Sequence, residues 1–255
     1  MVTILFDGIA YGMLLFVLAC GLTVTMGLMN FINLSHGAFA LAGGYATAAL
    51  TQKFGIPFLL CLPLAFIFSA LLGLIAEATL YRRLYRRNHL DQVLFTIGIV
   101  FMTVAAVDYI IGSQQQSIQL PDWLRGRVDL LGGSIGIYRL FIIILCGFLA
   151  LSIQWLLSHT RFGSQLRASV DDPRVARGLG ISVNKVFAIT FALGCGLAGL
   201  GGALGADLLG MDPTFPIKFM IYFLIVVTVG GTSGIMGTFF AALLLGIADV
   251  AGKYY

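Results

Sequence analysis

The chain has 255 residues, of which 59% are hydrophobic and only 10% are charged, and its mean hydropathy is +0.99. Average soluble domains carry about 25% charged residues, so this composition excludes a soluble globular domain and indicates a polytopic helical membrane protein. The net charge of +4 gives no reason to expect nucleic-acid binding, because in a membrane protein the placement of Lys and Arg relative to the spans is what matters.

Eight apolar segments approach the length that a helix needs to cross a bilayer, about 17–25 residues. They are 8–29, 37–52, 57–81, 92–112, 138–158, 185–206, 217–230 and 235–252. The first is too long for a signal peptide and has no basic residues before it, so it reads as a span. The second and seventh are short for complete spans, and each adjoins a polar or glycine-rich break. We therefore expect an all-α polytopic fold, a single transmembrane domain over residues 1–255, with some helices short or discontinuous.

The first break is the sequence NFINLSHG, residues 30–37. Irregular backbone at membrane depth must be buried in protein or line a water-filled cavity, and transporters use broken helices to aim helix N-termini at solute. Ser35 is placed to cap a helix beginning at His36, whose N–H groups suit a carboxylate. Asn30 and Asn33 offer donors and acceptors for a zwitterion or an amide. These four residues are candidate pathway residues; the alternative is that they only satisfy the broken backbone, with His36 capping or packing.

Basic residues indicate the topology. Nine of the fifteen Lys and Arg residues fall in two gaps, one after the third segment and one between the fifth and sixth: Arg82, Arg83, Arg86 and Arg87, then Arg161, Arg167, Arg174, Arg177 and Lys185. Both gaps lie on one side if every segment crosses, and the excess of positive charge makes that side cytoplasmic. The N-terminus and the long 113–137 connection are then predicted to be outside, in a bacterial inner membrane.

Small residues crowd the sixth segment, which contains Gly194, Gly196, Gly199, Gly201, Gly202 and Gly205. Small residues allow helix backbones to approach closely, so a packed interior helix is expected, the alternative being a poorly formed one. The four cysteines, Cys20, Cys61, Cys146 and Cys195, all lie in apolar runs and are expected to be buried small hydrophobic residues. No ligand cluster converges in the sequence, and we expect neither a metal site nor a cofactor.

The 160–184 loop contains signals for a short helix. Asp172 is a good N-cap, and Pro173 suits the first helical position. Val175 and Leu179 are four residues apart and share a face, Gly180 can end the helix in a left-handed conformation, and Ser182 can cap the next span.

A helix of about two turns is too short to be stable alone in water, so it needs the rest of the protein or a partner. A plain amphipathic turn at the membrane surface is one interpretation. The other is a helix that docks in a groove of a soluble subunit and transmits its motion, for which the candidate residues are Asp172, Pro173, Arg174, Val175, Ala176, Arg177, Leu179 and Gly180.

A second break, VGGTSGIMG, spans residues 229–237 and follows the first by 198 residues when Ser35 is matched to Ser233. Thr232 and Ser233 are candidate pathway residues in a gate or pathway wall; the alternative is a tight glycine turn between two helices.

Ionisable groups inside a membrane are functional candidates. Glu77 is expected to pair with Arg82, and Asp249 with Lys253 four residues on. Asp108 lies near the outer end of its segment, and Asp207 and Asp212 flank an outer turn where a soluble partner could dock.

Three stretches in the same order resemble the LivH-type permeases of branched-chain amino-acid ABC importers: GLMNFINLSHGAFALAGGY at 27–45, LRASVDDPRVARGLGI at 166–181 and VVTVGGTSGIMGTFFAALLLG at 226–246. The likeness runs over nearly the whole chain. Asp172, Ala176 and Gly180 match the coupling-loop signature, although the acidic position is more usually Glu. Such permeases usually continue past the position of Gly252 and the residues after it into a further apolar segment and a basic tail.

The resemblance implies an ABC-importer permease architecture with four kinds of contact: a second, LivM-like permease subunit, two ATP-binding subunits, a periplasmic solute-binding protein and membrane lipid. No P-loop sequence occurs in the chain, so ATP hydrolysis would belong to partner subunits and the chain itself is not expected to be an enzyme. Alternatives are a permease of the same class for urea, amides or aromatic acids, an ion-coupled secondary transporter, or a passive channel.

Overall fold

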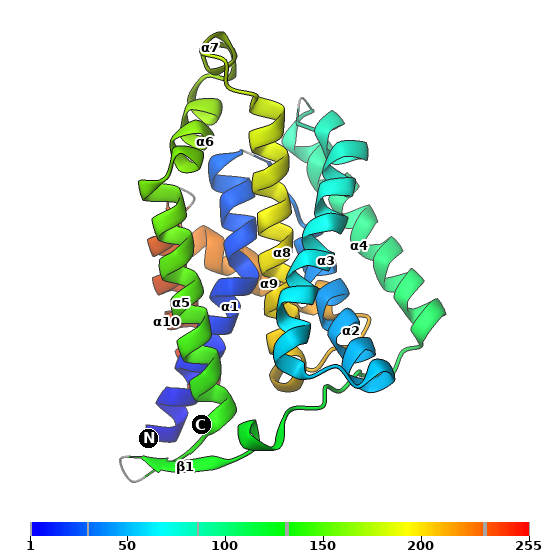
Figure 1. Cartoon of the computed structure of the whole chain (residues 1–255), viewed down its shortest axis with the longest axis vertical. Helices are drawn as coiled ribbons and strands as arrows, with labels where there is room; N and C mark the ends of the chain where they lie inside the picture. Colours follow the sequence, from blue (N-terminus) through cyan, green and yellow to red (C-terminus); the bar gives the residue numbers. More distant parts are fainter. Residues whose placement is uncertain (1, 30, 86, 131–132, 232–233, 255) are drawn as a thin grey trace.

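The computed structural model describes every residue except 1, 30, 86, 131–132, 232–233 and 255. Six helices in the described residues are long and apolar enough to cross a membrane. These are α1 (Val2–Leu28), α3 (Phe58–Thr79), α4 (His89–Ile111), α5 (Ile137–His159), α8 (Val183–Leu209) and α10 (Ile235–Tyr254). The two segments that the sequence marks as short form α2 (His36–Phe54) and α9 (Phe215–Gly230). The prediction of about eight hydrophobic helices is confirmed (Figure 1).

Several helices begin before the apolar segments that the sequence marks. α1 begins at Val2 rather than at residue 8, and α4 begins at His89 rather than at residue 92. The start of α4 is set by Asn88, whose side chain accepts a hydrogen bond from the backbone N–H of Asp91 at 2.7 Å. Hydropathy therefore locates the helices, and at α4 a side-chain cap sets the start.

Both chain termini lie at one end of the molecule, which we call the terminal end (Figure 1). The opposite end carries η1 (Tyr81–Arg83), α6 (Arg161–Asp171) and α7 (Pro173–Gly178), and we call it the α7 end. The two basic segments between spans thus lie at the same end of the molecule, the α7 end, as the alternation of spans predicts.

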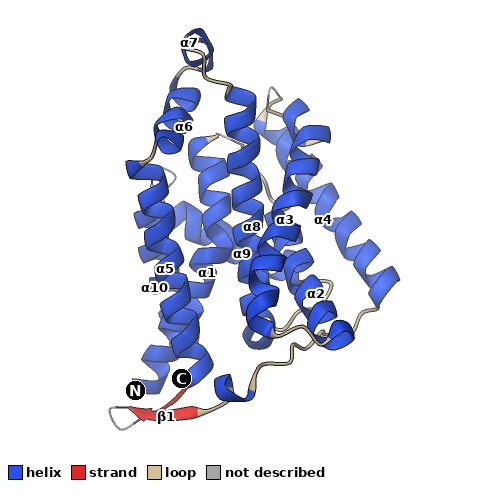
Figure 2. Ribbon diagram, viewed as in Figure 1, coloured by secondary structure: helices blue, strands red, loops and turns tan. Residues whose placement is uncertain are grey.

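The terminal end also holds the only strands among the described residues, β1 (Arg127–Leu130) and β2 (Gly133–Gly136), which pair in an antiparallel hairpin (Figure 2). The single turn η2 (Asp122–Leu124) precedes them. The expected all-α description omits this hairpin, which closes the long 113–137 connection. A further link ties this connection to the α8–α9 turn, where the Gln116 N–H donates to the Met211 carbonyl at 2.8 Å.

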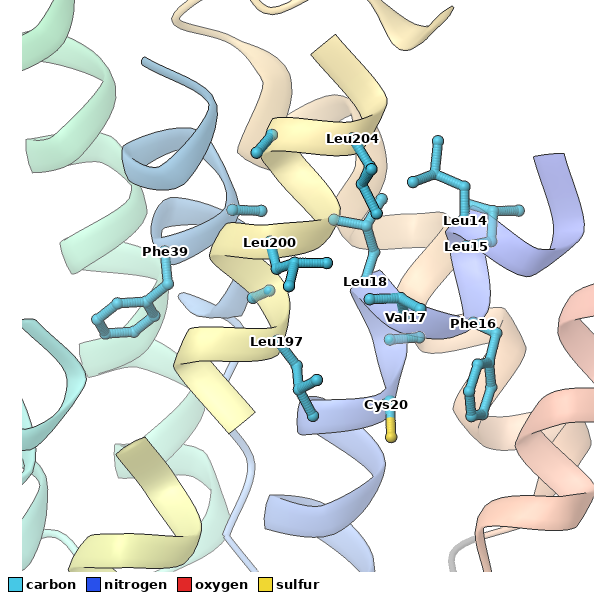
Figure 3. Close-up of a cluster of buried hydrophobic side chains, with 14 of the residues drawn as sticks. Leu14, Leu15, Phe16, Val17, Leu18, Cys20, Phe39, Leu197, Leu200 and Leu204 are labelled. Atoms are coloured by element: carbon cyan, nitrogen blue, oxygen red, sulfur yellow. The ribbon is translucent and has the colours of Figure 1, made fainter. Parts of the chain in front are cut away.

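The core is built around α8, against which α1, α2 and α3 pack. Leu197, Leu200 and Leu204 of α8 lie beside the 14–20 stretch of α1 (Figure 3). The glycines of α8 allow this close approach: a Cβ added at Gly202 would collide with the carbonyl group of Ala40. The prediction of a packed, glycine-rich interior helix is therefore confirmed. The four cysteines are all free and buried, as expected.

Candidate functional site

The break between α1 and α2 is buried in protein rather than exposed on the surface of the chain. Asn33, Ser35 and His36 are all buried, and so is Phe31 before them. Phe31 packs edge-on against Tyr81 at a ring-centroid distance of 5.6 Å. The prediction that this irregular backbone must be covered holds for the described part of the segment. Asn30, Thr232 and Ser233 lie outside the described residues, and their proposed contact with solute stays a prediction.

Two side chains of α4 satisfy the backbone of the break. The Ile32 N–H donates to Oε1 of Gln92 at 3.1 Å, and the Leu34 N–H donates to Oγ1 of Thr96 at 3.3 Å. Gln92 in turn donates through Nε2 to the carbonyl oxygens of Leu84 and Arg87 at 3.2 and 3.3 Å. The membrane interior has no water to accept hydrogen bonds from backbone N–H groups. A buried amide or hydroxyl side chain takes that role here.

The sequence alone did not identify Gln92 and Thr96 as residues that support the break. The signal was present, because two polar residues four apart share one face of an otherwise apolar helix. What the sequence does not show is that this face meets backbone about 60 residues earlier in the chain.

The predicted side-chain cap at Ser35 is wrong. Ser35 occupies the N-cap position of α2 but its hydroxyl makes no cap hydrogen bond. It donates instead to Oδ1 of Asn33 at 2.6 Å and lies 2.5 Å from the hydroxyl oxygen of Tyr81. Since a serine hydroxyl has one hydrogen, Tyr81 is the donor in the second bond. A buried tyrosine hydroxyl needs a partner, and here it takes one of the two acceptor sites of the Ser35 oxygen.

His36 packs at a close approach of α1 and α8. A Cβ added at Gly21 would lie 2.5 Å from Cε1 of His36 and 2.5 Å from the carbonyl oxygen of Gly194. The imidazole thus fills a notch that two glycines leave open, which matches the packing interpretation of this residue. Whether Asn33, Ser35 or His36 meets solute stays a prediction, and in this arrangement the three side chains are covered by protein.

The short helix of the 160–184 loop forms where the sequence predicts it. Oδ1 of Asp172 accepts hydrogen bonds from the N–H groups of Arg174 and Val175 at 2.8 and 3.1 Å, and Pro173 is the first helical residue. Gly180 follows the helix with φ +84°, the left-handed conformation. Ser182 occupies the N-cap position of α8 but makes no side-chain cap bond, so that part of the prediction is wrong.

The faces of α7 differ in exposure. Ala176 is 1% exposed and points toward the rest of the protein, whereas Val175 is 58% exposed and Leu179 is 74% exposed. Arg174 and Arg177 are also exposed. An apolar pair held out at the tip of the molecule by a capped helix is an arrangement suited to docking on another surface. The loop also contains α6, which the sequence reasoning missed; Oγ1 of Thr160 caps it by accepting from the Gly163 N–H at 3.3 Å.

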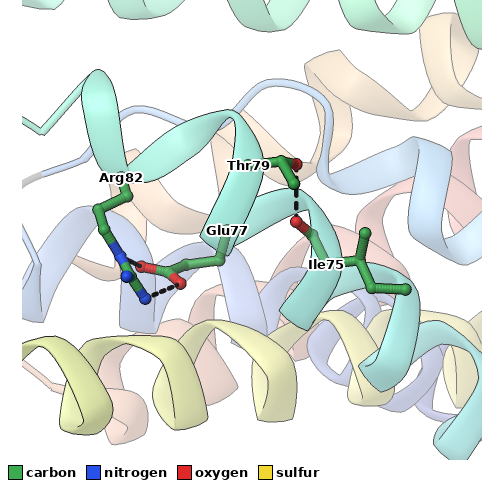
Figure 4. A network of polar contacts seen from close by, with 4 residues as sticks. All are labelled: Ile75, Glu77, Thr79 and Arg82. Carbon is green, nitrogen blue, oxygen red and sulfur yellow. Dashed lines mark hydrogen bonds and ion pairs between the residues drawn. The ribbon is translucent and has the colours of Figure 1, made fainter.

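Three carboxylates of the spans, Glu77, Asp249 and Asp7, form ion pairs. Glu77, with a fully buried side chain, accepts two hydrogen bonds from Arg82 at 3.0 and 3.3 Å, as predicted (Figure 4). Asp249 forms the predicted ion pair with Lys253 at 2.6 Å. Asp7 pairs with Arg139 of α5, a contact between helices that the sequence reasoning missed.

The turn between α8 and α9, at the terminal end, also contains internal hydrogen bonds and an ion pair. Asp212 forms an ion pair with Lys218 and accepts a hydrogen bond from the Thr214 N–H at 2.9 Å. Burial acts to raise the pKa of Asp212, but the hydrogen bonds from Lys218 and Thr214 outweigh it and hold the pKa below its usual value. Asp207, on the last turn of α8 before this connection, is exposed.

These features define a multi-pass helical membrane protein with a buried discontinuous helix at its centre and a capped, exposed helix at one end. The chain belongs to the family described as branched-chain amino acid transport system / permease component, whose pattern it matches over residues 4–255.

Relatives with assigned names support this membership. The chain is 31% identical to a "Probable branched-chain amino acid transport permease protein LivH" of Methanocaldococcus jannaschii, an alignment that covers 99% of this chain and 81% of the relative. It is 26% identical to the permease protein BraD of a high-affinity branched-chain amino acid transport system in Pseudomonas aeruginosa, covering 97% and 85%. The corresponding permease protein LivM of Salmonella typhimurium is 26% identical, covering 94% of this chain and 61% of LivM. No solved structure matches the chain.

Proposed function

We propose that this chain is a membrane-spanning permease subunit of an ATP-binding-cassette importer that translocates branched-chain or related amino acids. Separate ATP-binding subunits drive it, and a periplasmic binding protein delivers the solute. The observation that carries the proposal is α7, a helix too short to be stable alone, yet held rigid by Asp172 with Val175 and Leu179 exposed. Membership of the permease family supplies the context.

The two basic gaps at the α7 end support placing this end in the cytoplasm, where ATP-binding subunits would meet α7. The N-terminus and the hairpin then lie on the periplasmic side of a bacterial inner membrane, where a binding protein would dock. Similarity to both LivH and LivM relatives favours a pair of related permease subunits in the assembled importer.

The geometry gives little support to the alternative of an ion-coupled secondary transporter. Such a transporter needs a membrane carboxylate that is free to bind and release the coupling ion. Glu77 and Asp7, the two carboxylates best placed for this role, are engaged by Arg82 and Arg139.

The test is solute uptake by the assembled importer in cells, with radiolabelled leucine and with the ATP-binding subunits either active or inactivated. We expect uptake to require active ATP-binding subunits. Leu179→Asp places a charge on the exposed apolar face of α7, and we expect it to abolish uptake and to weaken recovery of the ATP-binding subunits with this chain.

Leu90→Asp is the matched control, because Leu90 is 65% exposed at the same end of the molecule but lies on α4 rather than on α7. It is expected to preserve uptake and recovery of the ATP-binding subunits. Uptake that continues without ATP hydrolysis, driven by a proton or sodium gradient, overturns the proposal. Binding of urea, amides or aromatic acids by the cognate binding protein would instead reassign the solute within the same class.

A further inference from the structure

A cavity of about 680 Å³ opens at the terminal end of the molecule. It lies among the first turns of α1, the last turn of α8, the start of α5 and the connection that carries the hairpin. Five charged residues line it, two acidic and three basic: Asp7, Asp207, Arg125, Arg127 and Arg139. Its volume falls in the range of small-molecule sites, about 300–1,000 Å³.

Two of these charged residues, Asp7 and Arg139, form part of the wall of the cavity. Asp7 is 8% exposed, and its carboxylate pairs with the guanidinium of Arg139. This pair joins α1 to α5, and each group neutralises the other. It therefore forms a fixed wall and leaves little capacity for a ligand.

The other three charges are available to a ligand. Asp207 and Arg127 form no ion pair with another described residue, and both are exposed. Arg125 has a 3.7 Å contact with Asp122, whose side chain is fully exposed. An ion pair in that setting contributes little and is readily exchanged for another partner. The cavity thus presents one free carboxylate on α8 and two guanidinium groups on the connection before α5.

Charges of opposite sign from separate elements of one cavity complement a zwitterion. Guanidinium groups bind a carboxylate through paired hydrogen bonds, and a carboxylate accepts the hydrogens of an ammonium group. The same cavity has apolar lining at Leu120, Leu124 and Leu208. Asp207 and Arg125 already attract each other across the cavity. A zwitterion offers a partner to both signs of charge at once, whereas a ligand with a single charge offers a partner to only one.

We infer that this outer cavity binds a free α-amino acid with an apolar side chain. Asp207 receives the ammonium group, Arg125 and Arg127 receive the carboxylate, and the side chain lies against Leu120, Leu124 and Leu208. The inference rests on the proposed function for the class of solute and identifies a place where the solute is held on the chain itself.

The test measures binding to the full chain in lipid nanodiscs by saturation-transfer NMR. The probes are L-leucine, 4-methylpentanoate, which lacks the ammonium group, and 3-methylbutylamine, which lacks the carboxylate. We expect leucine to bind about tenfold more tightly than either analogue, the difference that one charge-assisted interaction makes.

Asp207→Asn is expected to weaken leucine binding about tenfold and to leave 4-methylpentanoate unaffected. The double variant Arg125→Gln/Arg127→Gln is expected to weaken leucine binding and to leave 3-methylbutylamine unaffected. Asp108→Asn and Lys53→Gln are the controls, since both residues are exposed, at the ends of α4 and α2, and do not line the cavity. Thermal melting of each variant verifies that it is folded.

Absence of leucine binding to the unaltered chain, or equal binding by the cavity variants, overturns the inference. Uptake measurements separate this result from the importer proposal. ATP-driven uptake by a chain whose leucine binding is absent, or is unchanged in Asp207→Asn, refutes the cavity site and leaves the importer intact. Leucine binding that depends on Asp207 in a chain without ATP-driven uptake supports the site and refutes the importer.

Discussion

Oγ1 of Thr96 on α4 accepts a hydrogen bond from the backbone N–H of Leu34 at 3.3 Å, although the two residues lie 62 positions apart in the chain. The same hydroxyl donates to the Gln92 carbonyl of its own helix at 2.8 Å. Thr96 thus joins α4 to the break between α1 and α2. Most of α4 is exposed, and this polar contact joins the helix to the core together with the hydrogen bond from the Ile32 N–H to Gln92.

Replacing Thr96 with Val keeps the shape of the side chain and removes the acceptor. The buried Leu34 N–H is then unsatisfied, and we expect the free energy of unfolding to fall by about 1–3 kcal/mol. Thr96→Ser keeps the hydroxyl and is expected to retain most of the stability. The measurement is unfolding by denaturing detergent, followed by circular dichroism.

Thr103→Val is the control for the loss of a threonine hydroxyl from the same helix. Its Oγ1 donates only to the Ile99 carbonyl within α4, at 2.8 Å, so the change is expected to be small. Equal losses in Thr96→Val and Thr103→Val would show that the contact with Leu34 contributes nothing.

Local signals in the sequence were sufficient where the structure depends on neighbours in the chain. The N-cap at Asp172, the proline at Pro173 and the left-handed glycine at Gly180 act within one turn, and all three form as predicted. Ser35 has the same kind of signal, but Tyr81, brought in by the fold, takes its hydroxyl. Partners distant in sequence decide such cases, and a single sequence does not reveal them.

The parts of the fold that the sequence reasoning missed are those without strong hydropathy. α6 is amphipathic but polar on average, and the hairpin follows a connection rich in polar residues. Apolar length identifies spans because the bilayer imposes it. No comparable constraint acts on the segments at the two ends of the molecule, so their helices and strands depend on contacts with neighbouring elements.

Gly202 of α8 is a position where added volume has no room. A Cβ there would collide with the carbonyl group of Ala40 on α2, and backbone cannot move aside as a flexible side chain can. We expect Gly202→Ala to lower the free energy of unfolding by about 1–3 kcal/mol or to prevent folding. Folded yield and thermal melting in mild detergent measure the effect.

Gly98→Ala makes the same chemical change on α4, where a Cβ meets nothing within 4 Å. Alanine is the better helix former, so a gain of about 0.5–1 kcal/mol is expected. A similar loss of yield in both variants would contradict the packing role of Gly202.

The buried carboxylate of Glu77 depends on Arg82 for compensation. Arg82→Gln leaves the charge buried without its partner, and we expect a clear drop in melting temperature. The double variant Glu77→Gln/Arg82→Gln removes both charges and is expected to recover part of the loss. Arg83→Gln, at an exposed neighbour without an ion pair among the described residues, is expected to change little. A double variant no more stable than Arg82→Gln alone would rule out the coupling.

Gly180 tests whether the shape of α7 transmits motion from the ATP-binding subunits. Its φ of +84° favours glycine, and alanine in this conformation costs about 1–2 kcal/mol, even though a Cβ there meets nothing within 4 Å. We expect Gly180→Ala to raise hydrogen exchange across residues 173–182 and to lower uptake per ATP hydrolysed. Gly180→Asp is expected to uncouple hydrolysis from transport while the complex still assembles.

Gly178→Ala separates strain from added volume. A Cβ at Gly178 also meets nothing within 4 Å, but this residue has a helical backbone rather than a positive φ. Its exchange and uptake are expected to match the unaltered chain, because alanine fits a helix at least as well as glycine. If Gly180→Ala leaves both measurements unchanged, the left-handed turn after α7 is not required for coupling, and docking would depend on the exposed Val175 and Leu179 alone.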